Sequence, residues 1–402
     1  MQQQFLLGRQ PIFDNDFNVD SYELLFRGDF STTDGDQKTA QVIVNALMEV
    51  GVEKLSAGKH IHINASEKFL LDDIGLAFAL PADKVGIEVL EDVPVTPEVI
   101  AAVRALKEQG FTILLDDVIF KPHLKPLIEL ADIIKVDVMF VDDLTADVHE
   151  LRKYPVKLLA EKVEDHAMFE RCRALNFDLY QGYFFSRPDI VEGKKAPDSK
   201  VSILRALQKV MTANAVSDLQ DIIKQDISLS FRLLKYINSA AFGMRREIQS
   251  IEQALVLLGL ANVRRWLSLL SLATLGDDKP SELIRISLHR GRLLESIARN
   301  NRTAAPEDSF LVGMFSVIDA LLDKPMKEVL SEINLAPNIQ EGLLDPSSVL
   351  GIKLALAYMI EQGAWDQLSA TIEQHQIIHI DTLIRLNTEA MAWADEQMAE
   401  LQ

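Results

Sequence analysis

The sequence predicts an α/β barrel followed by an all-α domain. In the first 190 residues, short apolar runs alternate with segments of helical periodicity, which is typical of a mostly parallel sheet. After Lys200 the apolar residues recur at helical spacings of three and four. Between these parts, residues 186–200 hold two prolines, a glycine and several charges without an apolar period. We therefore expect a barrel over 1–190, a linker over 191–200, and a helical domain with C-terminal helices over 201–402.

Eight apolar runs are predicted strands, because each is short and is bounded by turn-forming or charged residues. Helical patterns lie between them. Eight strands that alternate with helices predict a closed barrel, whose functional residues lie at the carboxyl ends of the strands. The predicted strands are residues 4–7, 19–26, 60–64, 85–89, 112–115, 133–136, 156–160 and 182–185, and the predicted helices are 39–50, 67–70, 97–109, 125–130, 146–152 and 165–175.

The second half of the chain predicts helices throughout. Trp266 lies among leucines and valines at helical spacing, which favours a core position over a ligand site. The pair Arg264 and Arg265 allows two interpretations, ion pairs with nearby acids or a partner surface, and the sequence does not separate them. The predicted helices are residues 214–224, 229–238, 251–258, 263–275, 282–300 and 308–322.

Composition narrows the class of protein. The chain has 402 residues, of which 48% are hydrophobic, so it can form two or three domains with substantial cores. We see no apolar run of membrane-spanning length and no signal peptide, and the single Cys172 excludes an internal disulfide. We therefore expect a cytoplasmic protein without membrane contact. The net charge of −19 repels a phosphate backbone, which disfavours nucleic acid binding and suits a site for divalent cations.

Oxygen-bearing side chains follow several of the predicted strands. Hard ions such as Mg²⁺ or Mn²⁺ prefer oxygen ligands, and a lysine and a glutamate at the same rim add an anion-holding group and a candidate base. This set suits metal-assisted phosphoester hydrolysis. Taken singly, each residue also fits a polar network that satisfies the barrel mouth. The residues are Glu23, Asn64, Glu88, Asp116, Asp117, Lys135, Glu161 and Gln181.

The order of these motifs resembles that of EAL domains, the barrel phosphodiesterases that linearise cyclic di-GMP. The resemblance covers residues 1–190, and it implies the same barrel fold. The segments that carry it are YELLFR (22–27), IN (63–64), IEVLE (87–91), LDD (115–117), KVD (135–137), AEKVE (160–164) and QGYFFSRP (181–188).

The resemblance also implies roles for individual residues. Glu23, Asn64, Glu88 and Asp116 match the ligands of a first metal ion, and Asp117 matches a ligand of a second. Lys135 matches the lysine that holds a metal-bound water, and Glu161 matches the general base. Gln181 matches a further contact in the active site, and Gln10 and Arg27 fall where the family touches the nucleotide.

Three departures from the family bear on activity. The Glu-Ala-Leu motif is Glu23-Leu24-Leu25 here, and the stretch between Asp137 and Ala160 is shorter. More seriously, residues 118–122 contain no glycine where the family has Phe-Gly-Thr-Gly, and the branched residues there resist positive φ angles. We therefore expect a barrel without efficient catalysis, with the sensing of cyclic di-GMP as a role open to it. The alternative is an active Mg²⁺- or Mn²⁺-dependent phosphodiesterase that produces linear pGpG.

The helical half resembles an HDOD domain, a relative of HD phosphohydrolases. The segments that carry this resemblance are DISLSFRLLKYINSAAFG (226–243) and IQSIEQALVLLGL (248–260). HD enzymes bind metal through a His-Asp pair, but Ser316 and Val317 stand where relatives have that pair, and His289 is expected in the core. Residues 229–237 are too apolar for a DNA-reading helix. We therefore expect no cofactor in this domain and a role in binding other signalling proteins.

Overall fold

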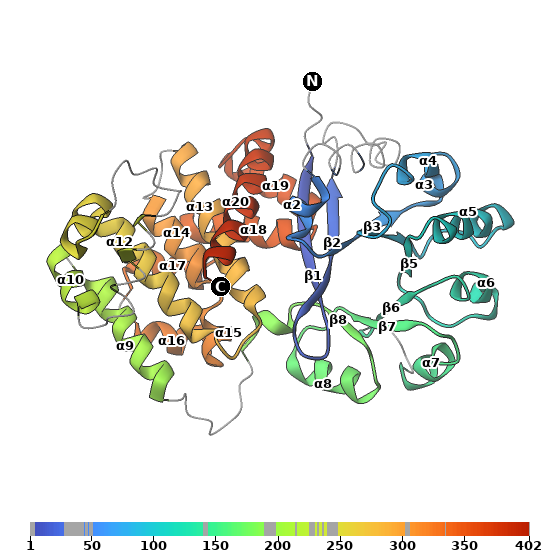
Figure 1. Cartoon of the computed structure of the whole chain (residues 1–402), viewed down its shortest axis with the longest axis horizontal. Helices are drawn as coiled ribbons and strands as arrows, with labels where there is room; N and C mark the ends of the chain where they lie inside the picture. Colours follow the sequence, from blue (N-terminus) through green and yellow to red (C-terminus); the bar gives the residue numbers. More distant parts are fainter. Residues whose placement is uncertain are drawn as a thin grey trace. The chain divides into compact units, whose positions relative to one another are not determined.

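The described chain forms two compact units, whose elements are labelled in Figure 1. The barrel unit contains residues 1–187 and 355–400, and the helical unit contains residues 188–354. The computed structural model describes residues 5–27, 44, 47, 51–139, 144–188, 198–213, 215–224, 230, 233–234, 237–238, 248–301, 306–333 and 335–401.

Eight strands close into a barrel in which each strand pairs with its neighbours in the sequence and β8 pairs with β1. Strand β1 runs antiparallel to both β2 and β8, and the other neighbours are parallel. The predicted α/β barrel is confirmed. The strands are β1 (Leu6–Phe13), β2 (Val19–Arg27), β3 (His60–Ala65), β4 (Val85–Val89), β5 (Thr112–Leu115), β6 (Ile133–Asp137), β7 (Lys157–Glu161) and β8 (Leu179–Gln181).

Side chains inside the barrel lie in layers, because every second residue of a strand faces the interior. One layer is a buried apolar cluster of Ile12, Leu114, Ile133, Leu159 and Leu179. Two positions further toward the carboxyl ends of the parallel strands, the interior residues become polar. These positions hold Asp116, Lys135, Glu161 and Gln181. The alternation of the sequence thus places the candidate residues directly above an apolar floor.

Two strands differ from their predicted bounds by more than one residue. Strand β1 extends to Phe13 and not to residue 7, because the run pairs along its length with β2. Strand β8 ends at Gln181, before the predicted strand at 182–185 begins. Gly182 has a φ of 148°, and a Cβ there would lie 2.1 Å from the carbonyl oxygen of Val163, so the chain turns away into a short 3₁₀ helix. The predicted helix at 39–50 lies outside the described residues except for positions 44 and 47.

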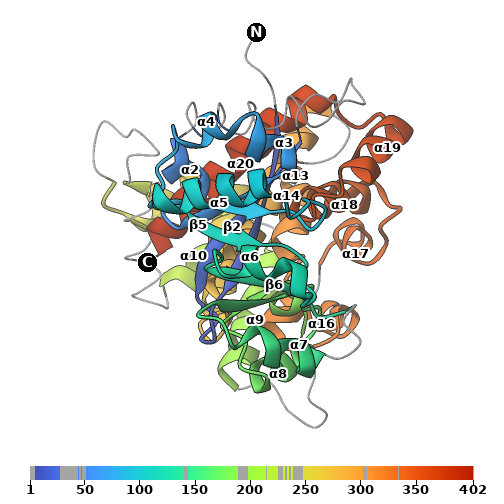
Figure 2. The same ribbon diagram turned by 90° about the vertical axis from the view of Figure 1, so that its right-hand side faces the viewer.

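Helices cover the outside of the barrel, as Figures 1 and 2 show for α5, α6 and α7. Three of them, α3, α5 and α8, begin with a side-chain cap that satisfies a free backbone N–H group. Thr96 accepts from the N–H of Val99 at 3.2 Å, and Asp165 accepts from that of Met168 at 2.8 Å. The helices are α2 (Val52–Ser56), α3 (Glu67–Leu71), α4 (Ile74–Ala77), α5 (Pro97–Glu108), α6 (Lys125–Ile128), α7 (Leu144–Leu151) and α8 (His166–Ala174).

The described part of the helical unit contains no strand, and its predicted all-α class is confirmed. Helix α12 spans both predicted segments, 251–258 and 263–275, and its backbone is non-helical at Gly259, where φ is 73°. Residues 191–197 of the predicted linker lie outside the described residues, and positions 198–200 begin α9. The helices are α9 (Asp198–Thr212), α10 (Val216–Lys224), α12 (Ile251–Leu275), α13 (Ser281–Asn301), α14 (Pro306–Phe315), α15 (Ile318–Leu322), α16 (Met326–Glu332) and α17 (Pro337–Leu344).

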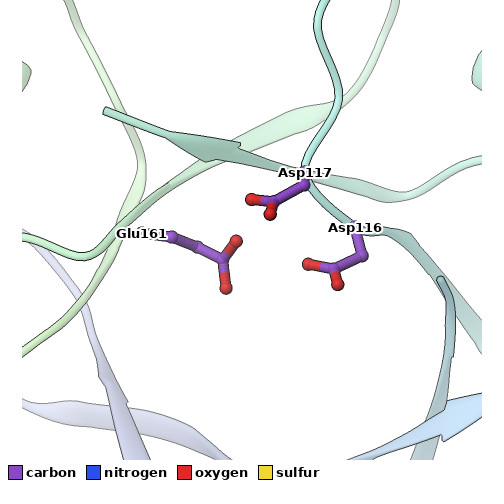
Figure 3. Close-up of side chains that lie close together, drawn as sticks. All are labelled: Asp116, Asp117 and Glu161. Atoms are coloured by element: carbon purple, nitrogen blue, oxygen red, sulfur yellow. The ribbon is translucent and has the colours of Figure 1, made fainter. Parts of the chain in front are cut away.

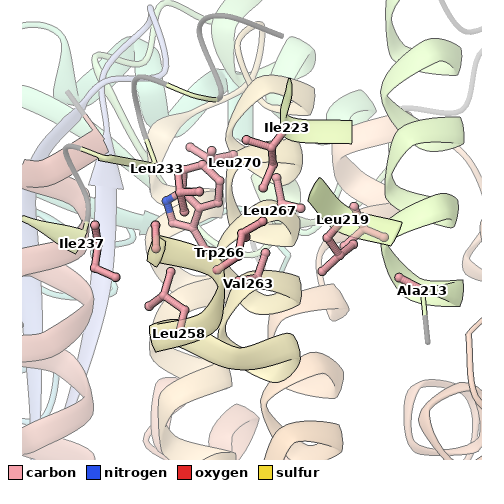
Figure 4. Close-up of a cluster of buried hydrophobic side chains, with 13 residues drawn as sticks. Ala213, Leu219, Ile223, Leu233, Ile237, Leu258, Val263, Trp266, Leu267 and Leu270 are labelled. Carbon is pink, nitrogen blue, oxygen red and sulfur yellow. The ribbon is translucent and has the colours of Figure 1, made fainter. Parts of the chain in front are cut away.

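A hydrophobic core joins α10 and α12 of the helical unit, as Figure 4 shows. Trp266 is 5% exposed within it, so its predicted core position is confirmed. Leu233 and Ile237 belong to the same cluster, which agrees with a core role for the predicted helix at 229–238, although most of that helix lies outside the described residues. His289 is also buried, as expected.

The structure resolves the two interpretations of Arg264 and Arg265. Arg264 donates to the backbone carbonyls of Val210 and Ala213, at 3.3 and 2.5 Å. Arg265 binds the buried carboxylate of Glu295 through two bonds of 3.1 and 2.7 Å. Both arginines are therefore held by the fold of the helical unit.

The last helices pack on the barrel. They are α18 (Val349–Glu361), α19 (Trp365–His375) and α20 (Ile380–Leu401), and residues from 355 onward belong to the barrel unit. Asn387 donates to the carbonyl of Leu7 in β1 at 2.8 Å. A Cβ at Gly8 would lie 2.3 Å from the carbonyl oxygen of Ile360, so β1 and α18 approach closely because position 8 has no side chain. The expected helical domain over 201–402 thus differs from the compact unit, which ends at residue 354.

One described helix, α12, is long and apolar enough by composition to cross a membrane, and half of its most apolar window is buried in the protein. The pair α17 and α18 passes the same test only together, across a bend of 41°. Our expectation that no apolar run reaches spanning length is therefore wrong for α12. A core helix of a globular protein passes the same test.

Candidate active site at the barrel mouth

Lys135 lies at the centre of the barrel mouth. Its side chain comes from β6 and is 2% exposed. The Nζ atom lies 2.7 Å from Glu161 Oε1, 3.2 Å from Glu23 Oε2 and 3.4 Å from Asp116 Oδ1, and it also pairs with Glu88. Four carboxyl groups, each from a different strand or strand end, therefore converge on one ammonium group.

Amide side chains hold one of these carboxylates in place. Gln181 Nε2 donates to Glu23 Oε2 at 2.7 Å and to Gln10 Oε1 at 3.0 Å. Asn64 Nδ2 donates to Glu23 Oε1 at 3.4 Å. The structure thus brings Gln10, Asn64 and Gln181 together with the acidic residues, as the sequence predicts.

A second group of carboxylates lies beside Lys135. Asp116, Asp117 and Glu161 each offer an oxygen, and these oxygens lie within 4.8 Å of one another. Figure 3 shows the two aspartates facing Glu161. Consecutive residues of an extended chain point to opposite faces, but Asp117 has a left-handed backbone with a φ of 44°. This conformation turns the second aspartate toward the same space as the first.

The electrostatics of the mouth favour an added cation. Burial raises the pKa of Glu161 to about 8, because the charges of Asp116 and Glu23 offset the opposing effect of Lys135. Burial, and then the charge of Glu23, raise the pKa of Glu88 well above its usual value. Burial by itself would lower the pKa of Lys135. The charges of the surrounding carboxylates have the larger effect, and they raise the pKa of this ammonium group. The negative charge that the carboxyl groups can carry therefore exceeds the positive charge of Lys135.

Unpartnered oxygens show that the residues present fit such a cation. Buried oxygens that accept no hydrogen bond are costly unless an ion or water satisfies them. Hard divalent cations take carboxylate and amide oxygens as ligands. The oxygens in question, buried and without a hydrogen-bond partner, are Asn64 Oδ1, Glu88 Oε2, Asp117 Oδ1 and Gln181 Oε1.

Comparison with known proteins identifies the family. The EAL domain model matches residues 37–188, and the HDOD domain model matches residues 195–334. The protein YuxH of Bacillus subtilis, itself uncharacterized, is 32% identical across 98% of this chain and 98% of its own length. The chain belongs to the EAL–HDOD family.

Further relatives carry more specific names. Cyclic di-GMP phosphodiesterase CdgJ of Vibrio cholerae is 29% identical across 97% of this chain and 92% of its own length. Among solved structures, BlrP1 of Klebsiella pneumoniae in complex with calcium and cyclic di-GMP covers 46% of this chain and 56% of its own, with 22% identity and a TM-score of 0.39. An EAL domain protein of Listeria monocytogenes covers 46% and 88%, with 22% identity and a TM-score of 0.38.

The glycine-free loop of this EAL barrel is accommodated differently from the sequence expectation. Positive φ falls on Asp117, while Val118 and Ile119 keep negative φ. The N–H of Val118 donates to the carbonyl of Lys135 at 3.0 Å, and its side chain is buried. Pro122 begins a 3₁₀ helix that ends at residue 124. The branched residues therefore do not have to adopt the backbone angles that they resist.

Arg27 lies at the far end of β2, four residues beyond Glu23. Residues four apart on a strand share a face and are about 13 Å apart along it. The guanidinium of Arg27 pairs with Asp366 of α19 at 2.7 Å. The predicted nucleotide-contacting arginine therefore has a carboxylate partner from the C-terminal helices.

Two residues of the EAL mouth were missed by the sequence analysis. Lys162, directly after Glu161, pairs with Asp117 at 3.4 Å and also with Asp137. His62 is buried two positions before Asn64, and burial lowers its pKa to about 3. The period of two along β3 could have placed His62 inside the barrel. The direction of Lys162 depends on its left-handed backbone, with a φ of 56°, which the sequence does not indicate.

Proposed function

We propose that the EAL barrel binds cyclic di-GMP with a divalent cation, Mg²⁺ or Mn²⁺, and hydrolyses one phosphodiester bond to give linear pGpG. The observation that supports this most directly is the gathering of buried carboxyl and amide oxygens around Glu161 at one end of the barrel. The name and near-complete alignment of CdgJ support the same activity.

Glu161 is the proposed general base. It accepts a proton from the attacking water as the water oxygen bonds to phosphorus and the ester bond to the ribose oxygen breaks. The ribose oxygen leaves with the bonding electron pair and takes a proton from solvent to become the hydroxyl of pGpG. Lys135 holds the Glu161 carboxylate in position at 2.7 Å. Gln10, Gln181 and Arg27 are the proposed nucleotide contacts. The side chains proposed to hold the cations are Glu23, Asn64, Glu88 and Asp116 for one ion and Asp117 for a second.

A divalent ion, when bound, polarises the phosphate and stabilises the negative charge that develops on it. Arg27 can approach a phosphate with two parallel N–H groups, which suits an anionic substrate. Gln181 already donates to two oxygens in the mouth, so its own Oε1 is left to accept from a ligand.

The test has two steps on one sample. Cyclic di-GMP is titrated calorimetrically into the protein with Ca²⁺, and the sample is then incubated with Mg²⁺ or Mn²⁺ and its nucleotides are separated. We expect binding followed by linear pGpG. Glu161→Gln should keep binding and lose at least about 100-fold in turnover. Full turnover in that variant would remove Glu161 as the base, and no binding would contradict the proposal as a whole.

A second candidate is a sensor that binds the nucleotide with little turnover. Lys162 favours it, because its ammonium group lies against the carboxylate expected to hold a second ion. Binding with Ca²⁺ but no product with Mg²⁺ or Mn²⁺ would support this candidate over the first.

For the HDOD domain we propose binding to other signalling proteins in the cytoplasm, without catalysis of its own. Val256 and Leu257 of α12 support a contact surface, because they are 78% and 55% exposed just before the break at Gly259. A photoreactive residue at position 256 should form discrete cross-links in cells. Leu257→Ser should weaken those cross-links without a change in melting temperature. An unaltered cross-linking pattern in Leu257→Ser would contradict the proposed contact surface.

A further inference from the structure

Lys162 forms ion pairs with acidic residues of the barrel mouth, and the match to the family assigns no role to these pairs. Its Nζ atom pairs with Asp137 and lies 3.4 Å from Asp117 Oδ2. The other oxygen of Asp117, Oδ1, is buried without a hydrogen-bond partner. One lysine thus occupies one oxygen of the carboxylate, while the other oxygen has no hydrogen-bond partner.

The backbone of Lys162 is left-handed, with a φ of 56°. Non-glycine residues rarely adopt this region, because Cβ crowds the carbonyl oxygen. The strain directs the side chain of Lys162 back over Asp117, which is itself left-handed at a φ of 44°. Two strained residues, one after β5 and one after β7 on either side of β6, therefore face one another. Strained backbone of this kind clusters at functional sites.

Two ammonium groups consequently bracket the cluster of Asp116, Asp117 and Glu161. Lys135 pairs with Asp116 and Glu161 from within the barrel, and Lys162 pairs with Asp117 from the rim. A second cation held by Asp117, beside Asp116 and Glu161, must share Asp117 with the Lys162 ammonium. The cation and the ammonium would then lie beside the same carboxylate. Two positive charges that are this close repel each other strongly where water is partly excluded.

We propose that Lys162 is an internal competitor for a second divalent cation at Asp117, beside Asp116 and Glu161, and that it limits this ion to weak occupancy. The inference rests on the cation site of the proposed function and adds to it the residue that sets its affinity. A half-exposed surface ion pair with no effect on the site is the alternative, since the Lys162 side chain is 49% exposed.

The test is a calorimetric titration of Mn²⁺ into the nucleotide-free, full-length protein, supported by electron paramagnetic resonance to count free Mn²⁺. Lys162→Gly removes the charge and relieves the backbone. Lys162→Arg keeps both the charge and the strain. Asn176→Gly is the backbone control, because Asn176 is also left-handed, with a φ of 62°, and precedes β8 at the opposite end of the barrel.

We expect Lys162→Gly to bind a further Mn²⁺ ion, or to bind it about tenfold more tightly, because one opposing charge is removed. Lys162→Arg and Asn176→Gly should bind as the wild type does. Unchanged binding in Lys162→Gly, including no binding in any variant, would overturn the proposal, and so would an equal gain in Lys162→Arg. None of these readouts needs nucleotide or turnover, so this proposal and the phosphodiesterase proposal fail independently.

Discussion

At the scale of single residues, a few charged side chains are buried. They differ in how far nearby opposite charges offset the free-energy cost of that burial. Lys135 has four carboxyl partners, so its burial is compensated. The burial of Asp319 in the HDOD domain is less fully compensated. Burial raises the pKa of Asp319 to about 6, and the charge of Arg290 offsets this rise only in part. A buried carboxyl with a raised pKa costs stability once it ionises.

Asp319→Asn should therefore stabilise the helical unit near neutral pH. Between the ordinary pKa of 3.8 and the folded value of about 6, the folded state holds more protons than the unfolded state, so wild-type stability falls as pH rises through this window. The variant escapes this loss, and we expect a gain on the order of 2 kcal/mol at pH 8 that shrinks toward pH 4. Asparagine can still accept from the N–H of Ala320, as Asp319 does at 2.9 Å.

Unfolding curves at several pH values measure this gain. The exposed Asp277, changed to asparagine, serves as the matched control and should alter stability by less than about 0.5 kcal/mol. A gain in Asp319→Asn that is equal at pH 5 and pH 8 would contradict the role of burial.

Gly182 illustrates a backbone requirement beside the active site. A Cβ at this position would lie 2.1 Å from the backbone oxygen of Val163, so Gly182→Ala must displace one of two strand ends. We expect a loss of about 2–3 kcal/mol and weaker binding of cyclic di-GMP, because the neighbouring Gln181 moves. Gly58→Ala is the control, since Gly58 also has a positive φ of 77° but open space around it.

Chemical denaturation and nucleotide titration measure both effects. Gly58→Ala should cost about 1–2 kcal/mol through its backbone alone and leave nucleotide affinity unchanged. Equal losses of stability in the two variants would show that the contact with Val163 is not limiting.

At the scale of elements, one buried ion pair links the first strand to the last helix. Arg9 of β1 binds Asp395 of α20 through two bonds of 3.1 and 2.8 Å and also donates to the carbonyl of Leu55 at 3.0 Å. Its guanidinium lies 4.7 Å from the centre of the Tyr22 ring. The contact joins positions separated by 386 residues, so it closes the barrel unit.

Asp395→Asn leaves the buried Arg9 without its countercharge, and we expect a loss of about 3 kcal/mol. The control is Glu389→Gln on the same helix. Glu389 pairs with Arg385 at 2.8 Å, but both side chains are more than half exposed, so this change should cost at most about 0.5 kcal/mol. Urea unfolding compares the two, and similar midpoints would show that the Arg9 pair contributes no more than a surface pair.

At the scale of the whole molecule, the two sequence domains and the two compact units do not coincide. Helices α19 and α20 follow the HDOD match in the sequence but pack on the EAL barrel, and α18 spans the boundary between residues 354 and 355. The barrel unit therefore depends on segments from both ends of the chain.

A chain truncated after Leu354 should lose barrel stability and keep the helical unit. The truncation removes the partners of Arg9, Leu7 and Arg27 in the barrel. It also leaves Trp266 as the remaining tryptophan, whose fluorescence reports on the HDOD core. We expect Trp266 fluorescence to report an unchanged unfolding midpoint for the helical unit. The loss of nucleotide binding with Ca²⁺ should report a lower unfolding midpoint for the barrel. Undiminished nucleotide binding would contradict a structural role for the C-terminal helices.

The amino-acid sequence is enough to predict the barrel, the helical class of the second half and the residues that meet at the mouth. These follow from local period and motif order, because every second residue of a strand faces inward and the ends of parallel strands share one edge. Leu114 and Asp116, or Leu159 and Glu161, show the pattern within three residues of chain. The roles of these residues in metal binding and catalysis remain predictions.

The packing of distant segments fixes how Lys162 approaches Asp117, where β8 ends and which unit contains the last helices. Each depends on contacts between positions distant in sequence, such as Gly182 against Val163 or Arg9 with Asp395. Local spacing carries no information on such contacts, because their free energy arises only when separate elements pack together. The left-handed backbones of Asp117 and Lys162 also depend on such distant contacts, since the surrounding fold holds these residues against their local preference.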